Sequence, residues 1–504
     1  MTGSAAAAAR MMSPHRWVDR WARQVPDKPA VVFRGRTATY RELAAEVRKA
    51  SAWLRSLGVG RGDRVGCWFR NDPAVVVLYL ACCRTGAVFV PWNVRLAPAE
   101  LAFQVEETDP AVVIVQDDLR ERVPPGLGGR WFACGERVPW SDAPGAVPPG
   151  EGPDDPEAPQ AIVFTSGTTG RPKGAVLPVR KGFFNALNAV EFLDLRHGDT
   201  VLLVLPLFHS GGLFIQLVPA LYQGCTVLLH PRFDPGEVAR AIEQDQATQF
   251  VAVPTMVRRV LDAVGAGPLS RLRVLGVGGE PVPRELAERC LGEGVEVRPL
   301  MGQTETSIFL WASARDLERR PGTVGRPVYH ADVRVGSDPD RPAPPGEASE
   351  IWVRGPTVFT GYWNAPDQTA SSFRGEWLRT GDLARTDEDG YFHVVGRAKD
   401  MYISGGENVY PAEVEAVLRQ HPGVREAAVV GVPDPTWGEV GHAVVEVGPG
   451  AAVDPEALKA WCAERLARFK CPRYVTLVER LPRTGLGKVH KAEVRNALER
   501  GDLR

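Results

Sequence analysis

Short apolar runs alternate with amphipathic stretches along most of the chain. Runs rich in Val and Leu are typical of the buried strands of a parallel sheet, and apolar residues that recur every three or four positions are typical of one helix face. The pattern predicts strands within residues 64–69, 87–92, 111–115, 160–166, 200–208, 225–230, 249–254 and 273–279, and helices within residues 98–107, 235–245 and 282–291. Such alternation predicts an α/β fold with layered, largely buried sheets.

A smaller block with a different pattern follows residue 400. It predicts a helix over residues 411–420, strands over 425–432 and 441–447, a helix over 455–469 and a strand over 474–479. A chain of 504 residues is too long for one compact core, so at least two domains are expected. We therefore expect a large N-terminal region of layered α/β sheets and a small α+β C-terminal domain.

Composition excludes several classes of protein. Lys and Arg total 60 against 61 for Asp and Glu, which gives a net charge of −1 and argues against a nucleic-acid partner. A 44% apolar fraction argues against a disordered chain. The eight cysteines contain no C-x-x-C spacing, so neither a zinc site nor a disulfide framework is indicated.

The sequence shows only weak signals for a membrane span or a signal peptide. The longest apolar stretch, residues 74–83, has about half the length that a membrane span needs. The alanine-rich beginning lacks the sustained apolar core of a signal peptide. We expect a soluble, cytoplasmic protein without a membrane span.

The strongest chemical signal is the sequence TSGTTGRPKG at residues 165–174, directly after a predicted strand. Glycines let several backbone N–H groups point at one anion, the hydroxyls add donors, and Lys173 adds a positive charge. The loop lacks the Walker spacing, but it predicts a triphosphate site more convincingly than an ordinary polar turn. The candidate ligands are Thr165, Ser166, Gly167, Thr168, Thr169, Gly170 and Lys173.

This loop resembles that of the adenylate-forming superfamily, which comprises acyl-CoA synthetases, adenylation domains and luciferases. The resemblance extends from Pro26 to Lys491, and further blocks stand in the family's order: residues 205–212, 276–283, 301–306, 380–382, 396–415 and 482–488. It implies two domains, residues 1–398 for ATP and acid binding and residues 399–504 as a mobile domain, with Lys399 as the hinge.

The resemblance assigns a set of nucleotide ligands. Thr304 and Glu305 would face the phosphates, and the Glu305 carboxylate would also hold Mg²⁺, whereas an isolated Thr-Glu pair would be an exposed loop. The family segment along the adenine corresponds to Gly279, Glu280 and Pro281. Met301 stands before Gly302 where the family usually has an aromatic residue, and a thioether stacks less well on a purine.

Two more residues match ribose and phosphate ligands. Asp382, in the sequence TGD, can accept hydrogen bonds from both ribose hydroxyls, as acidic residues do in other nucleotide sites. Arg397 corresponds to a second ribose or phosphate ligand. Taken alone, the first would be a structural turn and the second a surface arginine.

Lys488 is the principal catalytic candidate. A carboxylate that attacks the α-phosphate brings two anions together, and a lysine that contacts both stabilises the developing charge. The resemblance implies that the small domain takes two poses: one brings Lys488, in the place of the family's mobile lysine, to ATP, and in the other the loop with Gly405 and Gly406 lines the pantetheine tunnel. The resemblance places His209 at the acyl pocket, with a core histidine as the alternative reading.

The residues expected to bind CoA match the family's pattern less consistently than the nucleotide ligands do. Trp437 corresponds to the tryptophan that stacks on the CoA adenine, although a core tryptophan is the alternative. Arg84 corresponds to a CoA phosphate contact in some relatives. Within residues 465–473, Cys471 replaces a residue that is often basic or apolar, while Lys470 and Arg473 flank it.

Together the residues predict a two-step ligase that uses ATP, Mg²⁺ and CoA. A carboxylic acid would give acyl-AMP and pyrophosphate, and the CoA thiol would then displace AMP. Residues 183–186, 207–215 and 300–309 have little fixed charge, which favours an aryl or medium-chain acid. Two alternatives stay open: transfer of the acyl group to an amine, and a nucleotide-binding regulatory protein without catalysis. A homodimer also stays open.

Overall fold

The chain forms two compact units. The computed structural model describes residues 9–143, 152–153, 155–165, 172–280, 282–404, 407–448, 453–484 and 487–503. The first unit comprises Met1–Val333 and Val353–Leu378, and the second comprises Arg334–Trp352 and Arg379–Arg504. Residues 334–352 and 379–398, which the prediction assigns to the N-terminal domain, therefore lie in the second unit. The hinge at Lys399 stays a prediction.

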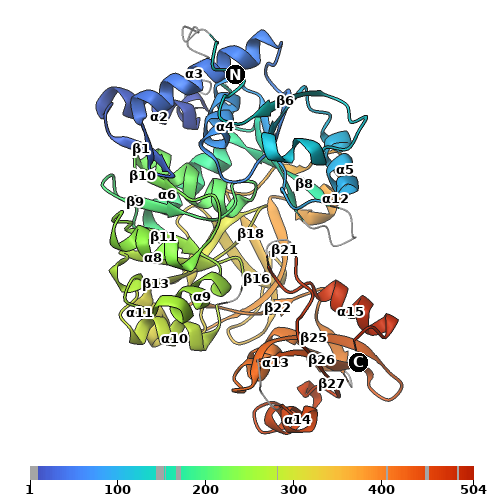
Figure 1. Ribbon diagram of the computed structural model, residues 1–504. Helices are drawn as coiled ribbons and strands as arrows, with labels where there is room; N and C mark the ends of the chain where they lie inside the picture. Colours follow the sequence, from blue (N-terminus) through green and yellow to red (C-terminus); the bar gives the residue numbers. More distant parts are fainter. Residues whose placement is uncertain are drawn as a thin grey trace. The chain divides into compact units, whose positions relative to one another are not determined.

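A nine-stranded sheet of the first unit contains the predicted strands at 200–208, 225–230, 249–254 and 273–279 (Figure 1). Its order is β15-β14-β13-β12-β11-β9-β10-β1-β2; the strands from β13 to β1 run parallel, and antiparallel strands form both edges. The strands are β1 (Pro29–Phe33), β2 (Arg36–Thr39), β9 (Thr200–Leu203), β10 (Thr226–Leu229), β11 (Gln249–Ala252), β12 (Val274–Gly278), β13 (Val297–Gln303), β14 (Ser307–Trp311) and β15 (Arg326–Pro327).

Helices cover this sheet through one apolar core. Buried residues of β9, β11 and β12 pack with those of the green helices in Figure 1: α8 (Pro235–Glu243), α9 (Pro254–Val264), α10 (Arg284–Gly292) and α11 (Ala314–Arg319). Helix α8 begins after Asp234, whose side chain accepts a hydrogen bond from the N–H of Glu237 and so caps the helix. This arrangement leaves the carboxyl ends of β9, β11, β12 and β13 along one edge of the sheet.

A seven-stranded sheet completes the layered part of the first unit. Its order is β19-β8-β7-β4-β3-β5-β6, parallel from β7 to β6 and antiparallel at β8 and β19. The strands are β3 (Arg64–Trp68), β4 (Val88–Pro91), β5 (Val112–Gln116), β6 (Arg130–Cys134), β7 (Pro159–Thr165), β8 (Lys173–Pro178) and β19 (Gly361–Tyr362). Its core includes Trp68, Trp92 and Ile162.

The other helices of the first unit connect and flank these sheets. They are α2 (Pro14–Gln24), α3 (Tyr40–Ser56), α4 (Pro73–Thr85), α5 (Pro98–Thr108), α6 (Val179–Phe192), α7 (Val218–Gln223), α12 (Pro366–Ser372), the 3-10 helices η1 (Asp117–Arg122) and η3 (Leu269–Arg271), and the π-helix η2 (Gly211–Leu217). The longest apolar stretch of the sequence is the buried helix α4. Over the described ranges, no helix is both long and apolar enough to cross a membrane.

A six-stranded sheet follows, with the order β17-β16-β18-β21-β20 and with β22 paired to β21. Its strands are β16 (Asp332–Asp338), β17 (Arg341–Pro342), β18 (Ser349–Arg354), β20 (Phe373–Arg374), β21 (Trp377–Thr386) and β22 (Phe392–Arg397). The chain passes from one compact unit to the other within β16, within β18 and again within β21.

The C-terminal block folds as the α+β arrangement that its pattern predicts, although the helix expected over residues 455–469 ends at Ala463. Its five-stranded sheet has the order β24-β23-β26-β25, with β27 parallel to β26. Its elements are β23 (Tyr402–Ser404), β24 (Glu407–Val409), α13 (Pro411–Arg419), β25 (Val424–Asp434), β26 (Gly438–Val447), α14 (Pro455–Ala463), η4 (Arg468–Lys470), β27 (Tyr474–Val478) and α15 (Lys491–Arg500). Along β25, Ala427 and Val429 pack toward α13 and α14, whereas Ala428 and Val430 pack toward α15. Both faces of this sheet are therefore covered.

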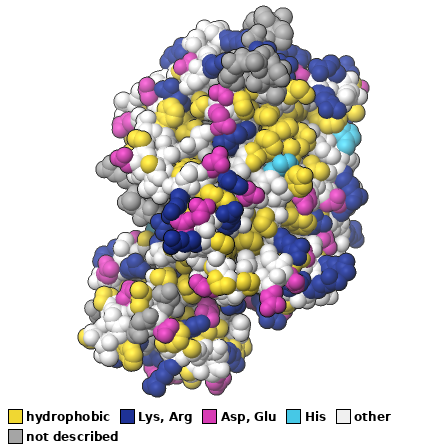
Figure 2. Space-filling view, turned by 180° about the vertical axis from the view of Figure 1, so that it is seen from behind, with side chains coloured by type: hydrophobic (Ala, Val, Ile, Leu, Met, Phe, Trp, Pro, Cys, Tyr) yellow, Lys and Arg dark blue, Asp and Glu magenta, His cyan; other side chains and the backbone are white. Residues whose placement is uncertain are grey.

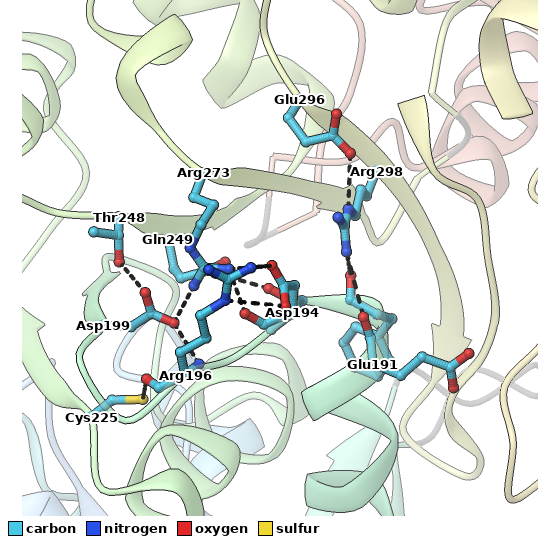
Figure 3. Close-up of polar contacts among 12 residues, drawn as sticks. Glu191, Asp194, Arg196, Asp199, Cys225, Thr248, Gln249, Arg273, Glu296 and Arg298 are labelled. Carbon is cyan, nitrogen blue, oxygen red and sulfur yellow. Dashed lines mark hydrogen bonds and ion pairs between the residues drawn. The ribbon is translucent and has the colours of Figure 1, made fainter. Parts of the chain in front are cut away.

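A network of ion pairs fastens the loop after α6 to the large sheet (Figure 3). Arg273, at the start of β12, pairs with the carboxylates of Asp194 and Asp199. Asp199 also accepts a 2.8 Å hydrogen bond from the Thr248 hydroxyl, and its side chain is 4% exposed. Burial raises the pKa of the Asp194 carboxyl, but the guanidinium groups of Arg196 and Arg273 outweigh it and hold that pKa below its ordinary value.

Loss of Arg273 is expected to destabilise the first unit. Arg273→Leu leaves the buried carboxylate of Asp199 without its cation, which costs about 3 kcal/mol of unfolding free energy. Arg196→Leu is the matched control, because Arg196 pairs with the same Asp194 but is 65% exposed, and its loss should cost less than about 1 kcal/mol. Urea unfolding of both variants measures the difference; equal losses would contradict the assignment.

The surface of the molecule reflects its near-neutral composition. Figure 2 shows Lys and Arg side chains interspersed with Asp and Glu side chains over the face that it draws. This mixture is the surface counterpart of the 60 basic and 61 acidic residues in the chain.

Candidate active site

The predicted phosphate loop connects two paired strands of the seven-stranded sheet. Thr165 ends β7 and Lys173 begins β8, and the two residues are directly opposite each other in the antiparallel ladder. The Thr165 hydroxyl lies 3.4 Å from the carbonyl oxygen of Lys173. The other predicted ligands of the loop lie outside the described residues: Ser166, Gly167, Thr168, Thr169 and Gly170.

Tyr362, which the sequence analysis missed, connects Glu305 to Lys173 of this loop. The Tyr362 hydroxyl donates a 2.9 Å hydrogen bond to Oε1 of Glu305. Lys173 Nζ lies 5.0 Å from the centre of the Tyr362 ring, within the range of a cation–π contact. Burial and the Glu305 charge raise the pKa of Tyr362, so Tyr362 stays a neutral donor. The structure thus brings Lys173 and Glu305 together.

Residues 356–359 contact both helix α6 and the backbone of Glu305. Arg180 donates to the carbonyl oxygens of Pro356 and Val358 at 2.7 and 2.6 Å, and Lys181 Nζ donates to that of Thr357 at 2.5 Å. The next N–H, that of Phe359, donates to the Glu305 carbonyl at 2.7 Å. Lys181 is fully buried, and burial lowers its pKa well below the ordinary value.

The Glu305 carboxylate fits the expected role in Mg²⁺ binding. It is 7% exposed, which excludes the alternative of a freely exposed loop residue. Within the described ranges no group of three His, Cys, Asp or Glu residues could hold a metal ion. Mg²⁺ is commonly bound by one or two carboxylates together with substrate phosphates, so a single carboxylate beside the phosphate loop suits it.

The expected adenine and phosphate residues follow β12 and β13. These strands are parallel neighbours with Gly278 opposite Leu300, so their carboxyl ends meet at the edge of the sheet where α/β proteins bind ligands. Gly279 is exposed with φ of 82°, Glu280 is half-buried, and Pro281 lies outside the described residues.

Met301, Gly302 and Thr304 are half-buried on the β13–β14 hairpin. A Cβ atom at Gly302 would lie 2.2 Å from the carbonyl oxygen of Ser307, so only glycine fits this close approach. The turn that follows carries Thr304 and Glu305, and Thr306 within it donates to the Ser307 carbonyl at 2.8 Å.

His209 lies on the loop after β9, at the same edge of the sheet as β12 and β13. Its ring is 4.6 Å from that of Phe208, and its carbonyl accepts a 3.0 Å hydrogen bond from Leu213 at the start of the π-helix. Of two other aromatic residues of the expected acyl-pocket segments, Phe183 is half-buried and Phe214 belongs to the core. Phe183 packs against Trp17 and Tyr222, and Phe214 is fully buried against Tyr79.

In the second unit, Asp382 and Arg397 are opposite each other on β21 and β22. Asp382 Oδ1 and Arg397 Nε are 2.9 Å apart, and the Arg397 side chain is 54% exposed. The two predicted ribose ligands therefore form one polar pair. Lys399 lies in the exposed turn directly after β22, a place that suits a hinge. Gly405 and Gly406 lie outside the described residues.

Lys488 is half-buried in a tight turn before α15. Its carbonyl accepts a 2.7 Å hydrogen bond from the N–H of Thr484, and Gly487 has a φ of 87°, which favours glycine. This turn presents the predicted catalytic lysine from the second unit.

Trp437 is a surface residue. Its side chain lies in the turn between β25 and β26 and is 50% exposed, which excludes the core alternative. Asp434 accepts a 3.0 Å hydrogen bond from the Trp437 N–H and lies 3.5 Å from Arg473 Nε. The Asp434 carboxylate thus contacts the backbone of Trp437 and the Arg473 side chain, whereas Lys470 pairs with Glu413.

The structure corrects the expectation for Arg84. This arginine is 5% exposed, and its Nη1 lies 2.7 Å from Asp19 Oδ2. The helix that carries it, α4, is buried along its whole length except for its first and last residues. Because the guanidinium is held in an internal ion pair, Arg84 does not present a cation to a CoA phosphate here.

Comparison with known proteins decides the family. The profile described as AMP-binding enzyme matches residues 18–363, and the one described as AMP-binding enzyme C-terminal domain matches residues 413–488. The chain belongs to the AMP-binding enzyme family. The resemblance seen in the sequence is confirmed, and so is the expected α/β architecture with a smaller C-terminal domain.

Similar members of the AMP-binding enzyme family are CoA ligases. A feruloyl-CoA synthase of Amycolatopsis sp is 42% identical over 488 residues, covering 95% of this chain and 98% of its own. An indoleacetate–CoA ligase of Aromatoleum aromaticum is 37% identical over 504 residues, covering 96% and 98%. These relatives confirm the expected class, an AMP-forming acid–thiol ligase.

Solved structures agree with this assignment. The o-succinylbenzoate CoA synthetase of Bacillus subtilis, in complex with an acyl-adenylate intermediate, has a TM-score of 0.86 and 31% identity, covering 95% of this chain and 97% of that one. The same synthetase in complex with ATP and magnesium ion has a TM-score of 0.84 and 30% identity, covering 95% and 99%. The expected ATP, Mg²⁺ and CoA are therefore those of the family.

Proposed function

We propose that this chain converts an aryl carboxylic acid to its CoA thioester in two steps. The acid oxygen attacks the α-phosphate of ATP, which gives acyl-AMP and pyrophosphate. The CoA thiol then attacks the acyl carbon, loses its proton, and displaces AMP. The observation that carries this proposal is the contact of Glu305 with Tyr362 beside Lys173, which joins a carboxylate to the predicted phosphate loop.

Each proposed residue has one task. Lys173 and the loop before it bind the β- and γ-phosphates, and Glu305 binds the Mg²⁺ that neutralises phosphate charge. Asp382 and Arg397 bind the ribose hydroxyls, and Gly279 and Met301 line the adenine. Lys488 contacts both the attacking carboxylate and the α-phosphate, so it stabilises the negative charge that develops between them.

An aryl acid is favoured by two lines of support. The relatives described above act, by their names, on ferulate and indoleacetate, which are both aryl acids. Phe208 lies against His209, the residue expected at the acyl pocket. Pyrophosphate release over ferulic, cinnamic, indoleacetic, medium-chain and dicarboxylic acids tests this; a dicarboxylic acid as the best substrate would contradict it.

CoA is favoured over an amine as the acceptor because the exposed Trp437 offers an adenine platform near Arg473. AMP release from a preformed acyl-AMP should be fast with CoA and stay at background with amines of similar concentration. We place the reaction in the cytoplasm, where ATP and CoA are available. Light scattering distinguishes a monomer from the homodimer that the sequence leaves open.

Replacing Trp437 by alanine is expected to raise the KM for CoA about tenfold, because stacking on a base contributes about 1–3 kcal/mol. Adenylate formation should be unchanged, since that step does not involve CoA. Trp437→Phe keeps an aromatic face and should restore most of the affinity. An unchanged KM for CoA in the alanine variant would contradict the proposed platform.

A further inference from the structure

The turn that carries Lys488 is tied on both sides to buried carboxylates of the C-terminal block. Before it, Arg483 Nη2 lies 3.1 Å from Glu446 Oε2. After it, Lys491 Nζ lies 2.7 Å from Glu415 Oε1. The side chains of Glu446 and Glu415 are only 3% and 8% exposed. Carboxylates are costly to bury unless they are paired, so each of these two carboxylates needs its ion pair in the folded state.

Glu446 connects the central strand β26 to the beginning of the turn. Its Oε2 accepts a 3.0 Å hydrogen bond from the N–H of Leu481 in addition to the one from Arg483. Arg483 also donates through Nη1 to the carbonyl oxygen of Gly487 at 3.0 Å. One guanidinium therefore bridges the sheet and the peptide group directly before Lys488.

Backbone contacts also connect the two ends of the turn. Thr484 and Lys488 are joined by a 2.7 Å N–H···O bond, and Arg483 and Val489 form a β-bridge. On the far side, Oε1 of Glu415 accepts a 2.8 Å hydrogen bond from the N–H of Val429, which anchors Lys491 to strand β25 through helix α13.

We propose that Arg483 and Glu446 are positioning residues for adenylate formation, because they fix the peptide from which the Lys488 side chain extends. The proposal rests on the function proposed above for Lys488. Ordering the turn in advance removes conformational freedom that the attack on the α-phosphate must otherwise restrict, and misplacement by about 1 Å can cost about 100-fold in rate. The thioester step does not involve Lys488, so it should be insensitive to this pair.

The test is Arg483→Lys, which keeps the positive charge but cannot bridge Glu446 and the Gly487 carbonyl together. Glu446 keeps the Leu481 N–H and Arg425, whose Nε lies 3.5 Å from Oε1, so the carboxylate stays partnered. We expect kcat for adenylation to fall about 10- to 100-fold, with the KM for ATP and the Tm close to wild type. Thioester formation from supplied acyl-AMP should be unchanged.

Arg419→Lys is the matched control. Arg419 pairs with Glu426 at 2.9 Å in the same block, with side chains 18% and 17% exposed, and this pair is outside the turn. Both half-reactions should keep wild-type rates in this variant. If it slowed adenylation as much as Arg483→Lys does, a general effect on the fold would explain the loss and the proposal would be wrong.

A second variant keeps the proposal open to refutation if Arg483→Lys folds poorly. Glu446→Gln keeps an oxygen that can accept from the Leu481 N–H but loses the charge that pairs with Arg483, so it should slow adenylation selectively as well. Wild-type adenylation in a folded form of either variant, or equal losses in both half-reactions, would overturn the proposal. If Lys488→Ala itself kept wild-type adenylation, the proposed function of Lys488 would fail, which is a separate result.

Discussion

Lys488→Ala is expected to slow adenylate formation at least about 1,000-fold, the scale at which a group that stabilises transition-state charge contributes. Transfer of the acyl group from supplied acyl-AMP to CoA should stay close to the wild-type rate, because the thiol attack does not require this lysine. Acid-dependent exchange of labelled pyrophosphate into ATP measures the first step, and thioester absorbance measures the second.

The matched control for this variant is Lys459→Ala. Lys459 belongs to the same compact unit and makes an exposed i,i+3 ion pair with Glu456 at 2.8 Å. Such pairs contribute less than about 1 kcal/mol, so both half-reactions and the fold should be unaffected. Equal loss of both half-reactions in a folded Lys488→Ala protein would contradict the assigned division of labour.

Glu305→Gln is expected to have the second largest effect. The amide oxygen can still accept the hydrogen bond from Tyr362, but the negative charge for Mg²⁺ is lost. Adenylation should fall about 100-fold or more, on the scale at which one removed electrostatic contact acts. The Mg²⁺ concentration at half-maximal rate should rise, which titration of pyrophosphate release against Mg²⁺ measures.

Tyr362→Phe separates the charge of Glu305 from its placement. It removes the 2.9 Å hydrogen bond and leaves the carboxylate charged. A hydrogen bond to a charged group contributes about 1.5–3 kcal/mol, so the adenylation rate should fall at least about tenfold, but less than in Glu305→Gln. Wild-type Mg²⁺ dependence in Glu305→Gln would show that Glu305 does not bind this ion.

Hydrophobic patterning predicted many of the buried strands, but others, such as β8, β13 and β21, were not predicted. The runs at 64–69, 111–115 and 249–254 became β3, β5 and β11, because consecutive apolar residues suit strands that are buried on both faces. The C-terminal block was predictable for the same reason. Its strand β25 alternates its buried faces between two apolar clusters.

The run at 200–208 shows where patterning is insufficient. The strand β9 ends at Leu203, although Val204, Leu205 and Phe208 are also buried. An apolar run indicates burial, but it does not distinguish a strand from a buried loop. The π-helix at Gly211–Leu217 was missed for a similar reason, because such a short helix with i→i+5 hydrogen bonds has no distinct apolar period.

Tertiary contacts decided the rest of the candidate site. No local signal connects Tyr362 to Glu305 or Arg84 to Asp19, because each pair meets only when distant segments pack. The sequence indicated which types of residue the chemistry needs. It could not indicate that Arg84 would form an internal ion pair with Asp19 or that Trp437 would be exposed.

The central claim is that an aryl-adenylate forms first and that CoA then consumes it. Rapid-quench analysis with ferulic acid, ATP and Mg²⁺ tests it most directly. Without CoA, we predict one equivalent of bound acyl-AMP and of pyrophosphate per active site. Added CoA should convert the acyl-AMP to thioester and AMP. Pyrophosphate that appears only when CoA is present, or ADP as the product, would contradict the account.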